Sequence, residues 1–464
     1  MLHFEQIINC PPDCFSAFGV PAGKVLFFDI ETTGFSPDSS YVYLIGCAFL
    51  DEGAVKLRQY FLDDISEEKQ LIREFGEFCA NFSMLVHYNG STFDLPYLQK
   101  KVHRHRLSGT YFCAAAVTDV SCPETASDAF GTKAAAAISG APQKERTVQQ
   151  SFDIYKSLLP YKKSLGLKDL KQKTVEQFLH IPRKDVFSGG DLISVYTEFT
   201  GRYRYECITN KNPSLDIKAT PDFHGTGLTK MPKSPAKALL YVLLLHNHED
   251  ITGLLAISAL LCIPRLLGGA FTVTELSGES AVTELSGNRA DQKNARTCPS
   301  SFKAFRLDTG FDTTLLSSCF SGKNVKLLPK GAFTAASSPA AVSLTVADTP
   351  GGLLLFVPAL FGTFKYFFED YKEYYYLPLE DCAMHKSVAQ FVEKEYRRKA
   401  TKETCYQKKT GCFLPQPEEI ITPAFRLHAK DRFSYFEDTE DALAKPTVLK
   451  NWLKSLLVWL FTPT

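Results

Sequence analysis

Residues 24–34 read Lys-Val-Leu-Phe-Phe-Asp-Ile-Glu-Thr-Thr-Gly, an apolar run with two acids near its end. The first seven residues are rich in Val, Ile and Phe and predict a strand, and the last three predict the turn after it. Alternate residues of a strand point to opposite faces, so Asp29 and Glu31 share one face while Phe28 and Ile30 share the other. Two neighbouring carboxylates repel each other unless a cation holds them or solvent screens them. The pair therefore indicates a cation site, and an exposed turn with ordinary surface acids is the alternative.

The segments that follow this strand predict an α/β domain. The spacing of apolar residues predicts three further strands, at 41–50, 55–61 and 84–88. It also predicts two helices, at 67–81 and 94–105. The order strand, strand, strand, helix, strand, helix is typical of a layered fold with antiparallel strands first and a helical crossover later. Residues 239–261 predict a long apolar helix.

Shifts in composition divide the chain. They predict an N-terminal extension at 1–23, a domain at 24–265, a linker or insertion at 266–304 and an accessory domain at 305–464. Within the first domain, residues 113–149 and 209–237 are rich in small or loop-forming residues and predict flexible insertions.

The C-terminal region has a different pattern. Residues 302–377 alternate short apolar runs with Gly, Pro and Ser clusters and predict a β-rich (α+β) domain. Residues 385–402 predict a helix, and 449–461 form a short amphipathic stretch. The hexapeptide Val-Thr-Glu-Leu-Ser-Gly occurs at 273–278 and again at 282–287, which indicates a local duplication in a loop rather than a repeat fold.

Composition excludes several classes of protein. The 464 residues contain 52 Lys and Arg against 51 Asp and Glu, so bulk charge does not drive binding to nucleic acid. The 13 cysteines form no Cys-x-x-Cys pair, which argues against a disulfide framework or a structural zinc site. No signal peptide is visible, and each apolar run is shorter than the roughly 20 residues that span a bilayer. These features predict a cytoplasmic protein that does not contact a membrane.

Two further motifs carry acids. Residues 89–96 read Asn-Gly-Ser-Thr-Phe-Asp-Leu-Pro, a turn that leads into a helix beginning near Asp94. An acid at a helix start is stabilised by the helix dipole by about 0.3–1 kcal/mol, so Asp94 alone fits a structural role equally well.

Residues 246–250 read His-Asn-His-Glu-Asp inside an apolar helix, where His246 and Asp250 share a face. Polar groups in a buried helix cost free energy unless they are paired. A core histidine with an exposed aspartate is the alternative.

The three motifs together resemble the DEDD exonuclease superfamily with the ribonuclease H-like fold. The chain contains the family's motifs in the family's order: Asp-x-Glu-Thr-Thr-Gly, then Asn-Gly-x-x-Phe-Asp, then a His or Tyr followed by Asn-x-x-Asp. Segments 151–155, 165–170 and 191–196 are similar to the YprB-type branch of predicted exonucleases. The resemblance covers roughly residues 20–265 without the two insertions. It implies a ribonuclease H-like mixed sheet flanked by helices.

The resemblance also implies an activity, which is metal-dependent 3′–5′ hydrolysis of the phosphodiester bonds of DNA or RNA. It implies two Mg²⁺ or Mn²⁺ ions about 3.5–4 Å apart, held by the carboxylates of Asp29, Glu31, Asp94 and Asp250. Asp29 would bridge both ions, Glu31 and Asp250 would hold the ion that carries the attacking water, and Asp94 would hold the other. His246 stands where the family places a His or Tyr that orients or deprotonates that water.

The His-x₃-Asp spacing departs from the family's commonest patterns. One branch has Tyr-x₃-Asp and the other has His-x₄-Asp, so His246 combines the spacing of the first with the side chain of the second. We therefore expect His246 either to act as a base or to hydrogen-bond the scissile phosphate.

Basic and polar residues near the motifs predict contacts to nucleic acid. Contacts to phosphates make binding salt-sensitive, although a solvated helix face is an equally good interpretation of each basic cluster. The predicted contact residues are Thr32, Asn89, Lys100, Lys101, Arg104, Lys162, Lys163 and Lys168. Residues 386–409 carry eight basic and three acidic residues, a net +5, and Tyr374–Tyr376 could stack on bases or form strand core.

Three functions remain open from the sequence. The first is the exonuclease, with nucleic acid as its partner. The second is a non-catalytic nucleic-acid-binding module with the same fold, which the unusual spacing of His246 and the two insertions motivate. The third is a scaffold that binds an unidentified protein partner through residues 271–464.

Overall fold

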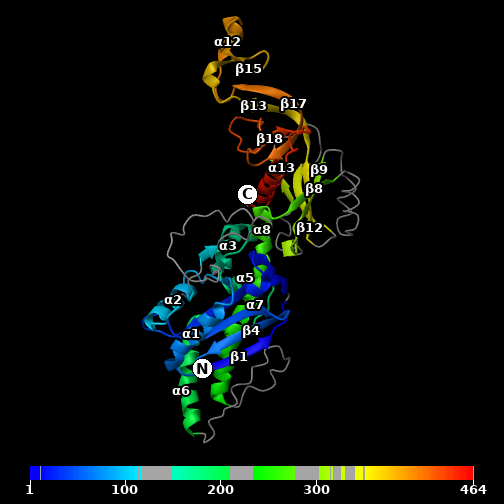
Figure 1. Cartoon of the computed structure of the whole chain (residues 1–464). Coiled ribbons are helices and arrows are strands. Elements are labelled where there is room, and N and C mark those ends of the chain that lie inside the picture. Colours follow the sequence, from blue (N-terminus) through cyan, green and yellow to red (C-terminus); the bar gives the residue numbers. More distant parts are fainter. Residues whose placement is uncertain are drawn as a thin grey trace, which may run out of the picture. The chain divides into compact units, whose positions relative to one another are not determined.

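The computed structural model forms two compact units, Met1–Pro264 and Arg265–Thr464, and each is described by itself. Figure 1 shows the first strands of this unit in blue with the green helix α7 (Pro235–Ile257) alongside them. The structure describes residues 1–10, 12–109, 111–112, 115–117, 149–209, 234–276, 302–313, 315–316, 325–329, 340–347 and 351–462. Most of the predicted insertion at 113–149 and of the loop at 209–237 lies outside these residues, and so does the second hexapeptide copy.

A mixed sheet of seven strands is the centre of the first unit. Its order is β1-β4-β3-β2-β5-β7-β6. Strand β2 is antiparallel to β3 and parallel to β5, which confirms the expected order of antiparallel strands and a later crossover. The predicted strands and the first two helices are confirmed to within two residues. The strands are β1 Leu2–Ile7, β2 Val25–Thr32, β3 Val42–Asp51, β4 Ala54–Phe61, β5 Met84–His87, β6 Ala115–Val117 and β7 Gln150–Asp153.

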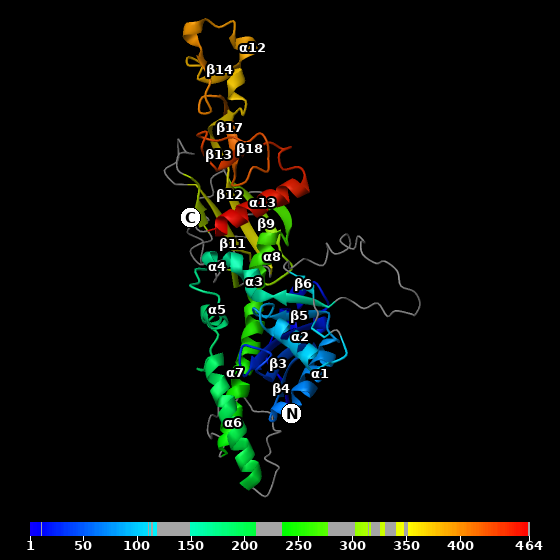
Figure 2. The same ribbon diagram turned by 90° about the vertical axis from the view of Figure 1, so that its left-hand side faces the viewer.

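Helices cover both faces of this sheet. The ring of Phe28 on β2 packs against Phe75 of α1 at 5.8 Å, whereas its neighbour Asp29 receives a hydrogen bond from Asn247 of α7. Because Phe28 and Asp29 point to opposite faces, α1 and α7 lie on opposite sides of the sheet, as Figure 2 shows. The helices are α1 Glu68–Cys79, α2 Asp94–Arg104, α3 Ile154–Leu158, α4 Lys162–Leu165, α5 Gln172–Phe178, α6 Gly189–Thr209 and α7.

Residues 1–23 are part of this domain, so the predicted N-terminal extension is wrong. Strand β1 pairs with β4 along its whole length, from Leu2 opposite Phe61 to Ile7 opposite Lys56. Phe15 and Phe18 pack their rings against Phe27 at 5.0 and 5.5 Å. The segment belongs to the sheet because its apolar residues are buried by strands far along the chain.

Helix α7 continues through a 3₁₀ turn into α8 (Cys262–Gly268). The combined run Pro235–Gly268 is long and apolar enough to cross a membrane by length and composition alone, which the separate apolar stretches in the sequence did not suggest. Of its most apolar window, 67% is buried inside the protein. This burial is typical of the core helix of a folded domain.

The second unit is β-rich, as expected. Its five-stranded sheet has the order β10-β11-β12-β9-β8, and two three-stranded sheets have the orders β13-β17-β18 and β15-β14-β16. Helix α13 (Pro446–Phe461) buries Trp452 against Phe305 and Phe436. The strands are β8 Thr272–Leu276, β9 Phe302–Asp308, β10 Val325–Leu327, β11 Ala341–Val346, β12 Gly352–Pro358, β13 Leu360–Phe367, β14 Tyr374–Leu377, β15 Cys382–His385, β16 Arg398–Lys399, β17 Tyr406–Gln416 and β18 Ser434–Glu437.

The structure adds detail to one prediction for the second unit and corrects another. Within the predicted linker or insertion at 266–304, β8 contains residues 273–276 of the first hexapeptide and pairs with β9. The helix predicted at 385–402 is limited to α12 (Lys386–Ala389), and Arg398 and Lys399 form a strand on β14. Only Ala389 and Ala400 of that segment are buried, so it has no apolar stripe to hold a long helix.

Lys101 is a core residue, which corrects its prediction as a phosphate contact. Its side chain is 1% exposed, and Nζ lies 3.0 Å from Oε1 of Glu68. Glu68 is also buried and accepts the backbone N–H of Val42. Lys101 therefore fastens α2 to α1 and cannot reach a nucleic acid.

Replacing Lys101 by Ala leaves the Glu68 carboxylate buried without its lysine partner. We expect the free energy of unfolding to fall by about 3 kcal/mol, because the buried carboxylate loses its lysine and keeps only the N–H of Val42 and the contact of Oε2 with Nε2 of His105 at 2.8 Å. Urea denaturation measures this loss. The exposed neighbour Lys100 gives the matched control, and Lys100→Ala should change stability by less than about 0.5 kcal/mol. Equal losses in the two variants would contradict a structural role for Lys101.

Candidate active site

The site begins where β5 stops covering the edge of β2. Strand β5 pairs only with Val25–Phe27, so the N–H of Ile30 is available to another partner. It donates to the carboxyl group of Asp94, the first residue of α2. Ile30 stands between Asp29 and Glu31, and this bond therefore brings the acid of the second motif to the acids of the first.

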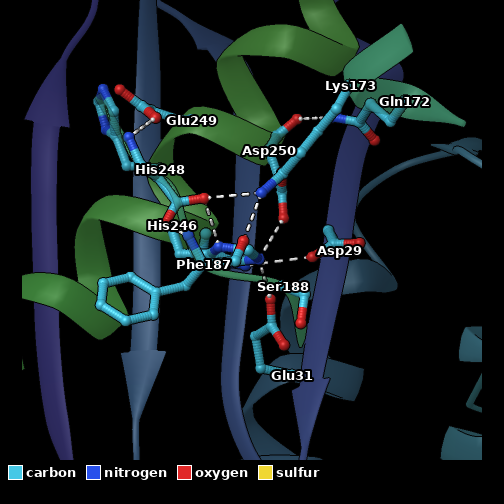
Figure 3. A network of polar contacts seen from close by, with 12 residues as sticks. Asp29, Glu31, Gln172, Lys173, Phe187, Ser188, His246, His248, Glu249 and Asp250 are labelled. Carbon is cyan, nitrogen blue, oxygen red and sulfur yellow. Dashed lines mark hydrogen bonds and ion pairs between the residues drawn. The ribbon is translucent and has the colours of Figure 1, made fainter. Parts of the chain in front are cut away.

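Helix α7 brings the third motif to the same place. Nε2 of His246 lies 3.1 Å from Oδ2 of Asp250 and 3.4 Å from Oε1 of Glu31. Donor atoms of these three residues all lie within 4.8 Å of one another, a spacing suited to one metal ion. Figure 3 shows Asp29, Glu31, His246 and Asp250 turned toward a common region between β2 and α7. The four predicted acids and His246 are thus brought together from three separate parts of the chain.

Asn247 fixes the position of Asp29. Its Nδ2 donates to Oδ2 of Asp29 at 3.3 Å, and its Oδ1 accepts from Nε2 of Gln59 at 3.0 Å. Gly46 lies opposite Asp29 in the β2–β3 ladder, and a Cβ at Gly46 would stand 2.1 Å from Oδ1 of Asn247. The glycine therefore leaves the space through which α7 reaches the strand.

A tight turn positions Asp94. Asn89 has φ +59°, and its N–H donates to Oδ1 of Asp153 at 2.8 Å. Gly90 follows, and a Cβ there would stand 2.9 Å from Oδ2 of Asp94. Asn89 and Gly90 thus shape the turn that delivers Asp94. The exposed side chain of Asn89 accepts from Oγ1 of Thr92 at 3.0 Å through Oδ1, and its amide can face a ligand from this side.

Burial shifts the pKa values of Asp29, Glu31 and Asp94 upward, and charges of nearby carboxylates add to the shift. Burial, followed by the charges of Asp94, Asp250 and Glu31, holds the pKa of Asp29 well above its usual range. Burial raises the pKa of Glu31 to about 8 and that of Asp94 to about 7. Among the described residues, no lysine or arginine forms an ion pair with Asp29 or Asp94. These acids therefore lack the positive charge that would let them ionise together, which fits a site for divalent cations.

Asp250 and His246 behave differently because they neutralise each other. Burial opposes ionisation of Asp250, but its hydrogen bond to His246 and the nearby charges of His246 and Arg183 lower its pKa overall. Burial also disfavours the charged form of His246, yet its bond to Asp250 and the surrounding acids raise its pKa to about 9.

The segment between α5 and α6 supplies functional residues that sequence reasoning missed. Arg183 is 10% exposed at its side chain, and its Nη1 lies 2.7 Å from Oδ1 of Asp250 and 2.9 Å from Oε2 of Glu176. Asp185 places Oδ2 2.7 Å from Nδ1 of His246. No local pattern marks these roles, since Asp250 and His246 lie more than 60 residues further along the chain. Asn247, in contrast, stands inside the third motif and could have been recognised there.

The predicted nucleic-acid contacts divide into two groups. Five of them are exposed, namely Lys100, Arg104, Lys163, Lys168 and Asn89, and two are half-buried, namely Thr32 and Lys162. These seven residues can face a ligand, whereas the buried Lys101 cannot.

An exposed aromatic residue that the motif analysis did not select also lies near the site. Phe35 is 86% exposed, and its ring lies 6.4 Å from that of Phe93, the neighbour of Asp94.

Comparison with known proteins identifies the domain. A family model described as the RNase_H superfamily matches residues 26–207. Residues 26–207 form a domain of the RNase H superfamily. This confirms the family resemblance inferred from the motifs. The matched part of the RNase H-like domain contains Asp29, Glu31 and Asp94, whereas His246 and Asp250 lie beyond it on α7.

A solved structure is also similar. It is the family B DNA polymerase from the hyperthermophilic archaeon Pyrobaculum calidifontis, with 16% sequence identity, a TM-score of 0.32, and 60% of this chain and 28% of the polymerase chain covered. This chain therefore spans less than a third of that polymerase. Comparison with curated proteins found no match.

Replacing Gly46 by Ala should displace Asn247 from Asp29. We expect a loss of about 1–3 kcal/mol, because the added Cβ overpacks the contact between β3 and α7. In an Asn247→Ala background the clash disappears, so the same substitution should cost at least about 1 kcal/mol less. A double-mutant cycle by urea denaturation measures the difference. Gly23→Ala, where a Cβ meets nothing within 4 Å, is the control, and additive effects at positions 46 and 247 would argue against the proposed contact.

The metal-free protein should lose stability as the pH rises from 5 to 8. Unfolded carboxyl groups release their protons near pH 4, whereas folded Asp94 and Glu31 keep theirs to about pH 7 and 8, so deprotonation over this range favours unfolding. His246 acts in the same direction, since its raised pKa gives stability that is complete below pH ~6.5 and lost toward pH 9. Thermal unfolding in EDTA at pH 5, 6.5 and 8 measures the effect. Mn²⁺ should restore stability at pH 8, and Asp94→Asn should flatten the decline between pH 5 and 7.

Proposed function

We propose that this protein is a divalent-metal-dependent 3′–5′ exonuclease that hydrolyses phosphodiester bonds of DNA or RNA. One observation carries the proposal: buried or partly buried acids from β2, α2 and α7 converge on one region. Burial raises the pKa values of Asp29, Glu31 and Asp94, and repulsion among the site acids adds to the shift at Asp29 and Glu31. Such an arrangement is costly for a fold and is expected where a cation-dependent reaction requires it.

The carboxylates of Asp29, Glu31, Asp94 and Asp250 would hold two Mg²⁺ or Mn²⁺ ions. When bound, such ions lower the pKa of a water molecule and stabilise the leaving oxygen of a phosphodiester. The protein's own residues fix the geometry: Asn247 orients Asp29, the N–H of Ile30 orients Asp94, and Arg183 orients Asp250. None of these partners depends on a substrate, so the site is organised in advance.

The surroundings of the acids suit a nucleic-acid strand. Phe35 and Phe93 offer an aromatic pair on which a base can stack, and Phe35 is almost fully exposed. The exposed cations Lys100, Arg104, Lys163 and Lys168 would contact phosphates. The 3′–5′ direction follows from the family resemblance rather than from these contacts.

A non-catalytic nucleic-acid-binding module is the second candidate. It is favoured by the ion pairs of Asp250 with Arg183 and His246, which neutralise one of the four acids without any metal. Binding that is salt-dependent and insensitive to EDTA, without cleavage, would support this function.

Asp29→Asn should abolish nucleotide release while the fold survives. We expect a fall of at least about 10³-fold in rate, because the amide cannot supply the negative charge that holds the cations. The assay uses single- and double-stranded DNA and RNA with Mn²⁺. With the wild-type protein, a substrate labelled at its 5′ end should give a ladder of shortening products. A substrate labelled at its 3′ end should release the label first, as a mononucleotide.

Asp38→Asn changes an exposed acid of the same unit and should retain full activity. Wild-type protein that leaves all four substrates intact in Mn²⁺ would overturn the exonuclease proposal. Activity that survives in Asp29→Asn would instead show a different catalytic centre or a contaminating nuclease.

A further inference from the structure

The imidazole of His246 is oriented as a metal ligand would be. Its Nε2 faces Oδ2 of Asp250 at 3.1 Å and Oε1 of Glu31 at 3.4 Å. Two ligands at right angles around one ion, each about 2.1–2.2 Å from it, lie about 3 Å apart. One nitrogen and two oxygen donors thus have the mutual spacing of neighbouring ligands on a single ion.

The other ring nitrogen has a carboxylate partner that fixes the ring. Nδ1 lies 2.7 Å from Oδ2 of Asp185. Asp185 is held in turn by Nζ of Lys173 at 3.0 Å and by the N–H of Phe187 at 3.0 Å. With Nδ1 donating to Asp185, Nε2 is the nitrogen that points at Glu31 and Asp250, and a cation bound there would take the place of the Nε2 proton. Histidines that ligate metals almost always donate their second ring nitrogen to a carboxylate, a carbonyl or a water in this manner.

The same contacts do not suit a base that acts on a free water. The His246 side chain is buried at 4% exposure, and both ring nitrogens already have protein partners. A general base must reach a proton on the reacting water. Here Nε2 is directed at the two carboxylates that the proposed function assigns to a cation.

We propose that His246 binds a divalent cation directly through Nε2, together with Glu31 and Asp250, and that Asp185 is its positioning residue. This inference rests on the proposed function for the presence of a cation at the four acids, and it adds a nitrogen to the ligand set. Arg183 occupies Oδ1 of Asp250, which leaves Oδ2 for the cation.

A nitrogen ligand changes the metal preference of the site. Sites built only from carboxylates suit Mg²⁺, whereas imidazole favours transition metals. We therefore infer that this chain prefers Mn²⁺ and similar transition-metal ions to Mg²⁺. In a competition experiment, Mn²⁺ should stay bound when Mg²⁺ is present at the same concentration, and equal occupancy by the two ions would contradict a nitrogen ligand.

Pulsed EPR on the full chain loaded with Mn²⁺ tests the proposal. Electron spin-echo envelope modulation should detect a ¹⁴N nucleus bound to Mn²⁺ in the wild type, and selective ¹⁵N-histidine labelling should shift it to ¹⁵N frequencies. His246→Gln should remove the modulation and weaken Mn²⁺ binding by at least about 100-fold. Asp185→Asn should retain the modulation but weaken binding by about 10- to 100-fold, as loss of a supporting partner does.

His248 provides the matched control, since it is also buried on α7 but interacts with Gln6 through Nδ1. His248→Gln should keep both the modulation and the Mn²⁺ affinity of the wild type. If His246→Gln does not fold, the labelled wild type still shows whether a histidine binds the ion, His248→Gln excludes the neighbouring imidazole of α7, and the loss of affinity in Asp185→Asn points to His246.

Nucleotide release is measured on the same preparations, so the two proposals fail separately. Mn²⁺ bound with histidine modulation but without nucleotide release supports this inference and overturns the proposed function. Nucleotide release with Mn²⁺ bound and no nitrogen modulation overturns the inference and leaves the proposed function standing. Absence of Mn²⁺ binding to the wild type at millimolar concentration overturns both.

Discussion

The repulsion between buried carboxylates on one face of β2 is the constraint on which the rest of the site depends. Asp29 and Glu31 stand side by side on the sheet, and Asp94 and Asp250 are added from two helices. Burial disfavours the charged form of each acid, and each charge disfavours the next. Such a group persists only if the surrounding fold holds it in place through other contacts. The polar residues beside the acids, such as Asn247 and Arg183, provide these contacts.

Close approach of backbones makes these contacts available. Gly46 lets Asn247 reach Asp29 across β3, and Gly253 on α7 lies against Glu176, where a Cβ would stand 1.9 Å from Oε1. Glu176 in turn binds Arg183, the partner of Asp250. Two glycines therefore control how near α7 lies to the sheet and to the segment before α6. A larger side chain at either position would separate the acids from the groups that orient them.

The segment between α5 and α6 gives the site its asymmetry. Arg183 and Asp185 act on Asp250 and His246, which lie on α7, and neither makes an ion pair with Asp29 or Asp94. One half of the site thus carries its own compensating charge, and the other half has only hydrogen-bond donors. This difference explains why the pKa of Asp250 is lowered while those of Asp29 and Asp94 are raised. Burial raises the pKa of Glu31 as well, in spite of the nearby charge of His246. The same difference in compensating charge would give the two halves of the site different affinities for a cation.

Local periodicity was sufficient to predict much of the fold and most of the acids. The alternation along residues 24–32 separates Asp29 from Phe28, and the i, i+4 spacing in α7 aligns His246 with Asp250. These relations are determined by backbone geometry over a few residues. These local relations do not depend on how the rest of the chain folds.

The remaining features depend on contacts between distant segments, and the sequence alone could not provide them. Lys101 resembles the neighbouring surface lysines until Glu68 is placed beside it, and β1 becomes a strand only because β4 offers an edge. Arg183 and Asp185 acquire their roles from partners more than 60 residues away. Residue type and spacing thus determined which acids share a face. Tertiary packing decided which charges are buried together, because desolvation depends on neighbours that no local pattern specifies.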